Sequence, residues 1–167
     1  MKLGYMEQQV IAAELAATGA QELLAATSAH LAYSAEDGSP RVVPVGFFWT
    51  GTAFVVSTAV TAPKVAALQA RPAVALSIEG GSTPEQARAL SVRGRASIEI
   101  VDGLVPEYVA AARRSMGVEA AAKFEKSCRE MYDQTARIAI VPNWVRFYDF
   151  GAGRMPKFLK ELAERRS

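Results

Sequence analysis

Strands and helices do not alternate strictly along this sequence, and their order is the strongest constraint on its fold. Segments rich in alanine and leucine come first, a series of strands with one inserted helix follows, and a second helical segment precedes the last strands. A doubly wound parallel sheet requires alternation, whereas short strands joined by tight turns are typical of an antiparallel barrel. The sequence therefore predicts an α+β fold, mainly β with added helices.

Turn and cap signals set the expected element boundaries. Residues 36–40 and Thr50-Gly51 predict turns, Pro63 suits the first turn of a helix, and Arg71-Pro72 ends that helix. We expect helices at residues 5–26 (broken at Thr18-Gly19), 63–70, 104–133 (broken near Gly117) and after residue 156. We expect strands at residues 41–49, 53–58, 73–78, 89–101, 137–141 and 144–149, the last two joined through Pro142-Asn143.

The length of 167 residues suits one domain, which we expect to cover residues 1–167. Within it, residues 1–28 form N-terminal helices, and residues 104–134 form a helical insertion between barrel strands. We expect no linker and no internal repeat.

The composition excludes several classes of partner. A net charge of +2 gives no basic face of the kind that nucleic-acid binding requires. Residues 1–10 lack the apolar core of a signal peptide, and no stretch approaches the about 20 apolar residues that a membrane span needs. Cys128 is the only cysteine, which fits a reducing compartment. We therefore expect a cytoplasmic protein that binds neither nucleic acid nor membrane.

The usual catalytic groupings are absent from the sequence. His30 is the only histidine, so a multi-histidine metal site is excluded, and we expect it at the start of a short strand that precedes the barrel. No Gly-x-Ser-x-Gly elbow, Rossmann fingerprint or Walker loop occurs. We predict no metal site and name no catalytic residue.

Two features indicate a site built from backbone and basic groups. Residues 57–64 leave a strand with the hydroxyls of Ser57, Thr58 and Thr61 and enter a helix whose first turn contains Lys64. Free amides at a helix start, together with hydroxyls and an ammonium, form a phosphate site. Pro44 lies inside an expected strand, which indicates either an edge strand or a place where the sheet opens and a flat ligand stacks.

These features, in this order, resemble the FMN-binding split-barrel superfamily of pyridoxamine 5'-phosphate oxidase-like proteins. The matching stretches run between about residues 30 and 156. They are residues 37–45 (DGSPRVVPV), 49–51 (WTG), 57–58 (ST), 63–68 (PKVAAL), 71–76 (RPAVAL), 92–96 (VRGRA) and 141–149 (VPNWVRFYD).

The resemblance implies a split barrel of six or seven antiparallel strands that forms a homodimer, with two cofactor sites at the subunit interface. Arg41, Val43, Pro44 and Val45 would run beside the flavin-type ring. The phosphate would be held by Ser57, Thr58, Thr61 and Lys64. Trp144 and Arg146 would either reach the partner's site or serve core and dimer packing.

The departures from the family pattern narrow the expected reaction. Pro63 replaces the arginine that often precedes the lysine, so Lys64 carries more of the phosphate binding. The tail Phe150–Pro156 lacks the basic, histidine-containing segment of authentic pyridoxamine phosphate oxidases, which argues against that reaction. The tail is closer to actinobacterial relatives that use FMN or the deazaflavin coenzyme F-420.

We therefore expect an oxidoreductase that uses FMN, or alternatively F-420, to transfer a hydride to or from a small conjugated substrate. Arg71, Arg88 and Arg93 could serve the acidic tail of F-420 or be surface charges. A non-enzymatic flavin carrier or sensor is the alternative, and a haem-binding split barrel is a further one.

Overall fold

The computed structural model describes residues 5–166 and contains one antiparallel sheet of seven strands in the order β2-β1-β5-β6-β7-β4-β3. The strands are β1 (Ser28–Ser34), β2 (Pro40–Gly46), β3 (Phe48–Trp49), β4 (Phe54–Ala59), β5 (Ala73–Gly80), β6 (Arg88–Asp102) and β7 (Gln134–Asp149). The helices are α1 (Gln8–Ala16), α2 (Thr18–Leu24), α3 (Pro63–Ala70), α4 (Pro106–Ser115), α5 (Val118–Met131) and α6 (Lys157–Glu164), with a short 3-10 turn at Pro84–Gln86. The prediction of an antiparallel, split-barrel α+β fold is confirmed.

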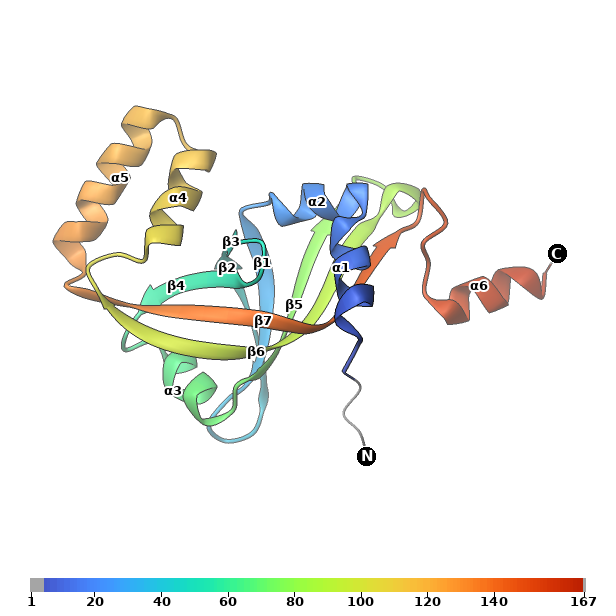
Figure 1. Ribbon diagram of the computed structural model, residues 1–167, viewed down its shortest axis with the longest axis horizontal. Helices are drawn as coiled ribbons and strands as arrows, with labels where there is room; N and C mark the ends of the chain where they lie inside the picture. The colour runs from blue at the N-terminus through green and yellow to red at the C-terminus, as the bar shows by residue number, and fades with distance from the viewer. Residues whose placement is uncertain (1–4, 167) are drawn as a thin grey trace.

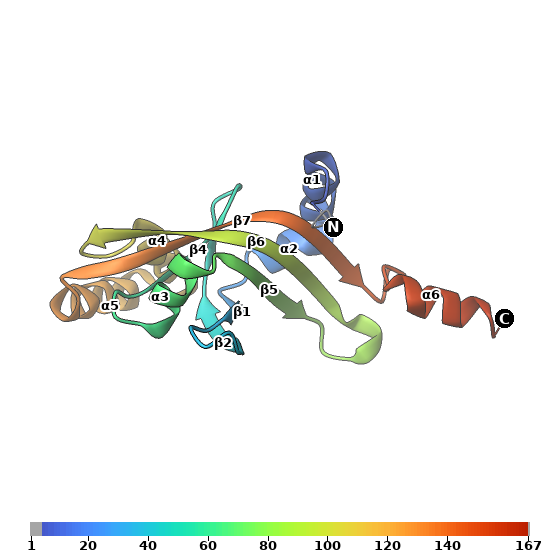
Figure 2. The same ribbon diagram turned by 90° about the horizontal axis from the view of Figure 1, so that it is seen from below.

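The long β6–β7 ribbon organises the molecule (Figure 1). The helical hairpin α4–α5 lies at one end of this ribbon, and α6 extends away from the other end in both views (Figures 1 and 2). The single-domain division stays a prediction. Residues 1–4 and 167, which that prediction includes, lie outside the described residues, as does part of the stretch expected to lack a signal peptide.

The main core fills the inner face of the curved sheet. Its largest fully buried side chains come from several strands and from α3, and along β5 they alternate with less buried positions, whereas β4 and β7 also bury side chains on their outer face. They include Leu31, Phe54, Leu68, Leu76, Ile78, Leu90, Ile138 and Ile140. A second, smaller cluster of Ala53, Val55, Val105 and Ala139 lies on the outer face under α4.

The strand expected at residues 41–49 is interrupted at Phe47. Its larger part, β2, pairs with β1, and only Phe48 and Trp49 pair with β4. The expected hairpin is therefore limited to a two-residue strand. Phe47 is buried in the core, with its ring 5.7 Å from that of Phe54, and this packing turns the chain between the two strands.

The expected break at Pro142-Asn143 is wrong, because β7 continues through it. Gly94 pairs with Pro142, whereas Arg93 pairs with Trp144, so Asn143 is an extra residue in a β-bulge. A bulge accommodates proline because the ladder is already disrupted there. His30 also differs from its expected position: it lies within β1, which pairs with β2 and β5, and is exposed.

Candidate functional site

The barrel is open between β2 and β4. These two strands are not neighbours in the sheet order, and β2 pairs only with β1, yet their Cα atoms come within 8 Å of each other. Pro44 therefore lies in an edge strand, where its missing N–H costs no ladder bond on the free side. Most of the residues expected to bind a cofactor lie on β2, on β4, in the turn after β4 or at the start of α3, whereas Trp144 and Arg146 lie on β7.

The predicted ring-side residues on β2 alternate between the two faces. Val45 is 8% exposed and belongs to the core, and Val43 packs against the core. Pro44 is exposed, opposite His30 in register. The exposed Arg41 guanidinium lies 3.7 Å from the Asp37 carboxylate. The side chains of Pro44 and Arg41 are thus available to a ligand, whereas Val43 and Val45 can offer only backbone groups.

Two of the predicted phosphate residues meet. The Nζ of Lys64 lies 3.5 Å from the Oγ1 of Thr58, and both residues are half-buried. The start of α3 has no side-chain cap and no acidic residue in its first turn. Within residues 5–166 Lys64 forms no ion pair with a carboxylate. This arrangement gathers positive charge and a hydroxyl donor at a helix N-terminus, which is chemistry that fits a phosphate.

The other two predicted phosphate residues lie apart from this pair. Adjacent residues of a strand point to opposite faces, and the structure places Ser57 on the outer face of β4, facing α4 and α5. Thr61 is exposed in the turn between β4 and α3. The structure therefore does not bring all four predicted side chains together.

Trp144 and Arg146 lie on β7 with partners of their own. The Arg93 guanidinium lies 4.3 Å from the centre of the Trp144 ring, a cation–π contact. The Nη1 of Arg146 lies 3.6 Å from Glu14 Oε1 of α1, and the same carboxylate binds Arg154 at 2.9 Å. Neither side chain meets Thr58 or Lys64 within the same chain.

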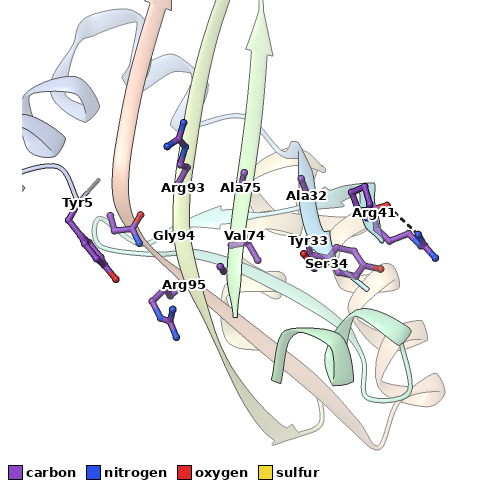
Figure 3. Close-up of a pocket in the computed structure, with 13 residues that line it drawn as sticks. Tyr5, Ala32, Tyr33, Ser34, Arg41, Val74, Ala75, Arg93, Gly94 and Arg95 are labelled. Carbon is purple, nitrogen blue, oxygen red and sulfur yellow. Dashed lines mark hydrogen bonds between the residues drawn. The ribbon is translucent and has the colours of Figure 1, made fainter. Parts of the chain in front are cut away.

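A hollow of about 430 Å³ lies on the outer face of β1, β5 and β6 (Figure 3). Ala32, Ala75 and Gly94 form part of its lining. Tyr5 stands on one side of it, and Tyr33 and Arg41 stand on the other. Its further lining residues are Ser34, Pro40, Ala73, Val74, Arg93, Arg95 and Asn143. Three arginines line this hollow, of which sequence reasoning named Arg41 and Arg93 as candidate ligand-binding residues and missed Arg95.

An ion pair fixes the helical hairpin to the outer face near the opening. The Arg137 guanidinium of β7 binds Oε1 of Glu107 on α4, and this bond lowers the pKa of the Glu107 carboxyl and raises that of Arg137. Oε2 of Glu107 is buried without a hydrogen-bond partner. Burial, with the nearby Cys128, raises the pKa of the Tyr108 hydroxyl. Sequence reasoning missed all three residues, because nothing local to α4 indicates which strand it covers.

The described residues contain no group of three or more His, Cys, Asp or Glu side chains that could hold a metal ion. None of the helices in residues 5–166 combines the length and apolar character needed to cross a bilayer.

Residues 17–149 match the family model described as Pyridoxamine 5'-phosphate oxidase. The chain belongs to the pyridoxamine 5'-phosphate oxidase family. The resemblance expected from the sequence motifs is thereby confirmed. A search of curated proteins found no significant match.

The fold of the chain is also similar to solved structures of pyridoxamine 5'-phosphate oxidase-like proteins. A conserved hypothetical protein from Mycobacterium tuberculosis is similar over 90% of this chain and 89% of its own, with a TM-score of 0.64 and 20% identity. An F420 reductase is similar over 75% and 94%, with a TM-score of 0.56 and 26% identity. The haem storage protein HutZ from Vibrio cholerae is similar over 77% and 90%, with a TM-score of 0.55 and 16% identity. Structural relatives of the family thus include a reductase and a haem storage protein.

Proposed function

We propose that this protein is a homodimeric oxidoreductase that binds FMN, or alternatively F-420, at the opening between β2 and β4. It transfers a hydride to or from a small conjugated substrate. One observation carries the proposal: the half-buried Lys64 ammonium lies beside the Thr58 hydroxyl at an uncapped helix start and has no carboxylate partner within residues 5–166.

The electrostatics of this corner favour a bound anion. A lysine in the first turn of a helix opposes the helix dipole, at a cost of about 0.3–1 kcal/mol that an anion would remove. The cofactor phosphate would accept hydrogen bonds from Lys64 Nζ, from the Thr58 hydroxyl and from the backbone N–H of Lys64, because Pro63 has no N–H and that of Val65 donates to the Ala62 oxygen. Thr61, in the turn just before α3, would join them by a change of rotamer, whereas the Ser57 side chain faces away from this phosphate.

The free edge of β2 suits a flat ring. Because β2 pairs only with β1, its outward backbone groups near Val43 and Val45 can bind the polar edge of a ring, while Pro44 offers a flat apolar surface. A flavin-type ring supplies the hydride chemistry when bound, so the chain needs no catalytic histidine or paired carboxylates of its own. The chain positions the ring and stabilises negative charge on it.

The choice between FMN and F-420 depends on which arginines could bind the acidic tail of F-420. Arg88 is paired with Glu22, and Arg71 donates to the backbone oxygen of Ala35 at 3.3 Å. Arg93 and Arg95 line the outer-face hollow, and no ion pair to a carboxylate is recorded for either within residues 5–166. FMN requires only the Lys64 corner, whereas the acidic tail of F-420 would also engage these two arginines. The similarity to an F420 reductase supports keeping F-420 as the alternative.

A second copy of the chain would complete the site. Trp144 and Arg146 do not reach the Lys64 corner of their own chain, and in a homodimer they could contact the cofactor of the other copy. We place this function in the cytoplasm, where a lone cysteine such as Cys128 remains reduced.

The Lys64→Ala variant tests this proposal. Losing one charge-assisted hydrogen bond, worth about 1.5–3 kcal/mol, should weaken cofactor binding roughly 10- to 100-fold. FMN and F-420 are titrated separately against the apoprotein, with binding followed by cofactor fluorescence. Lys64→Arg should keep most of the affinity. Lys126→Ala, on an exposed position of α5, is the matched control and should bind as the native protein does. Native affinity in Lys64→Ala would exclude this phosphate site.

A haem-binding role is the second candidate, favoured by one observation. The exposed His30 side chain lies within β1 and is opposite Pro44 in register, so a histidine lies one strand away from the free edge of β2. Titration with haemin and a His30→Ala control tests it: a Soret band that depends on His30 would favour haem. Turnover of a reducible dye with the regenerated cofactor separates an oxidoreductase from a flavin carrier or sensor.

A further inference from the structure

A small cavity of about 130 Å³ lies between the α4–α5 hairpin and the outer face of β4. The hairpin contributes Tyr108, Ala111, Ala112, Ser115, Met116 and Phe124 to its walls. The remaining lining residues are Thr27, Gly46, Phe47, Val55 and Ser57. It is separate from the outer-face hollow, with which it shares no lining residue.

The lining suits an uncharged ring. No lysine, arginine, aspartate or glutamate borders the cavity, and its lining includes the apolar side chains of Phe47, Val55, Ala112 and Phe124. The Ser115 hydroxyl already donates to the backbone oxygens of Ala111 and Ala112. An engineered apolar cavity of about 150 Å³ in another protein stays dry and binds benzene, so a cavity of this size and lining accommodates one six-membered ring.

The walls of the cavity are fixed at both ends of α4. Near its start, Glu107 binds Arg137 of β7. Near its end, Arg114 donates to the backbone oxygen of Ala25 at 3.2 Å and lies 5.2 Å from the centre of the Phe48 ring. The rings of Tyr108 and Phe124, 5.7 Å apart, join the two helices. The cavity is therefore preformed, and a ligand would not have to order its walls.

The cavity adjoins the proposed cofactor site. It meets that site at the end of β2 and not at the Lys64 corner, because Ser57 in its wall and Thr58, which contacts Lys64, point to opposite faces of β4. Gly46 and Phe47, at the end of β2, also border it. We propose that this cavity binds the single apolar ring of the substrate and holds it beside the cofactor. The binding of an apolar ring is inferred from the cavity alone. The identification of that ring as part of the substrate rests on the proposed function.

The Tyr108 side chain lines the cavity and carries a hydroxyl, which is protonated at neutral pH as a phenol ordinarily is. Together with the Ser57 hydroxyl, it gives the wall two groups that can donate hydrogen bonds. A carbonyl or hydroxyl substituent on the ring can therefore be oriented, whereas an anionic substituent meets no cation.

Toluene binding to the cofactor-free protein, measured by ligand-observed NMR, tests the ring site. Toluene should bind, benzoate should not, and Ala111→Leu should weaken toluene binding at least tenfold by filling the cavity. Ala122→Leu, on an exposed position of α5 outside the lining, is the matched control and should leave binding unchanged. Phe124→Ala enlarges the cavity and should admit naphthalene, which the native protein should exclude.

Absence of toluene binding, equal binding of benzoate, or equal toluene binding in Ala111→Leu would overturn the ring site. These outcomes do not depend on a cofactor, so they are distinct from a failure of the proposed function. In the cofactor-loaded protein, toluene should change the absorbance or fluorescence of the bound cofactor, and Ala111→Leu should abolish the change. Toluene binding without any such change would overturn the assignment to the substrate.

Discussion

Glu107 and Arg137 connect two segments that are 30 positions apart in the sequence, and their ion pair joins α4 to the sheet. Both side chains are largely shielded from water, at 19% and 25% exposure, so the pair is screened less than an exposed one. Oε2 of Glu107 is buried with no hydrogen-bond partner, which reduces the net benefit of the pair.

Glu107→Gln should lower the free energy of unfolding at pH 7 by about 1–3 kcal/mol, because it removes a charge-assisted hydrogen bond from a shielded arginine. The folded protein lowers the pKa of Glu107 from its ordinary value of 4.5. The stabilisation that the ionised Glu107 gives the folded protein is therefore fully present above pH 4.5, and it is lost as the pH falls through the lowered pKa. Urea titrations of both proteins at several pH values should show the difference shrinking below pH 4.5.

Glu130→Gln is the control for this prediction, because Glu130 is exposed near the end of α5. It should change the free energy of unfolding by less than about 0.5 kcal/mol. A difference between native protein and Glu107→Gln that does not vary with pH would show that the carboxylate charge is not what stabilises α4.

At the scale of single residues, the sequence predicted some contacts and could not predict others. Lys64 and Thr58 could be paired in advance, because a strand end followed by a helix start brings their positions close together. Ser57 was grouped with them by its hydroxyl, yet neighbouring strand residues face opposite sides, so it faces α4 instead. Glu107 and Arg137 carry no local signal, because their contact depends on how a helical hairpin folds back over the sheet.

The β6–β7 ribbon shows how tertiary context overrides local signals at the scale of elements. Pro142-Asn143 indicated a loop between two strands, but Gly94 on the neighbouring strand lets the chains approach closely enough to keep one continuous β7 with a bulge. A Cβ built on Gly94 would lie 2.6 Å from the backbone oxygen of Val141 and 2.9 Å from Cγ2 of Ile140. The two strands can therefore pair this closely at the bulge only because residue 94 has no side chain.

Gly94→Ala should lower the free energy of unfolding by about 1–3 kcal/mol, because the added methyl overpacks the ribbon and the opposing backbone must shift. Thermal and urea unfolding measure the effect. Gly117→Ala is the control, since nothing lies within 4 Å of a Cβ there and its φ is −65°. Its effect should stay below about 1 kcal/mol. Native stability in Gly94→Ala would show that the ribbon opens at the bulge without cost.

For the whole molecule, the order of elements and the family motifs were sufficient to predict the sheet, its antiparallel pairing and the place of α3. They were not sufficient for the position of α4–α5, whose contacts with the sheet create the small cavity. An order of elements constrains topology, whereas a cavity depends on which side chains meet across elements.

At the scale of the whole molecule, the side chains on the outer face of the sheet indicate a surface that a second copy of the chain covers. Ala32, Ala73 and Ala75 occupy positions where a solvated strand usually carries polar side chains, and Val42 and Val141 are 66% and 56% exposed. A second copy packed on this face would cover these side chains. We therefore expect a mass of twice 17.9 kDa by light scattering.

Ala75→Glu places a charge in the middle of this face and should convert the dimer to monomers, because an unpaired charge is costly in an interface. Ala122→Glu, on the exposed side of α5, is the matched control and should leave the dimer intact. If a second copy completes the cofactor site, Ala75→Glu should weaken cofactor binding in parallel with dimerisation, although Lys64 and Thr58 are unchanged. Dimers that persist in Ala75→Glu would place the interface elsewhere. Monomers with native cofactor affinity would show that the Lys64 corner is a complete site within one chain.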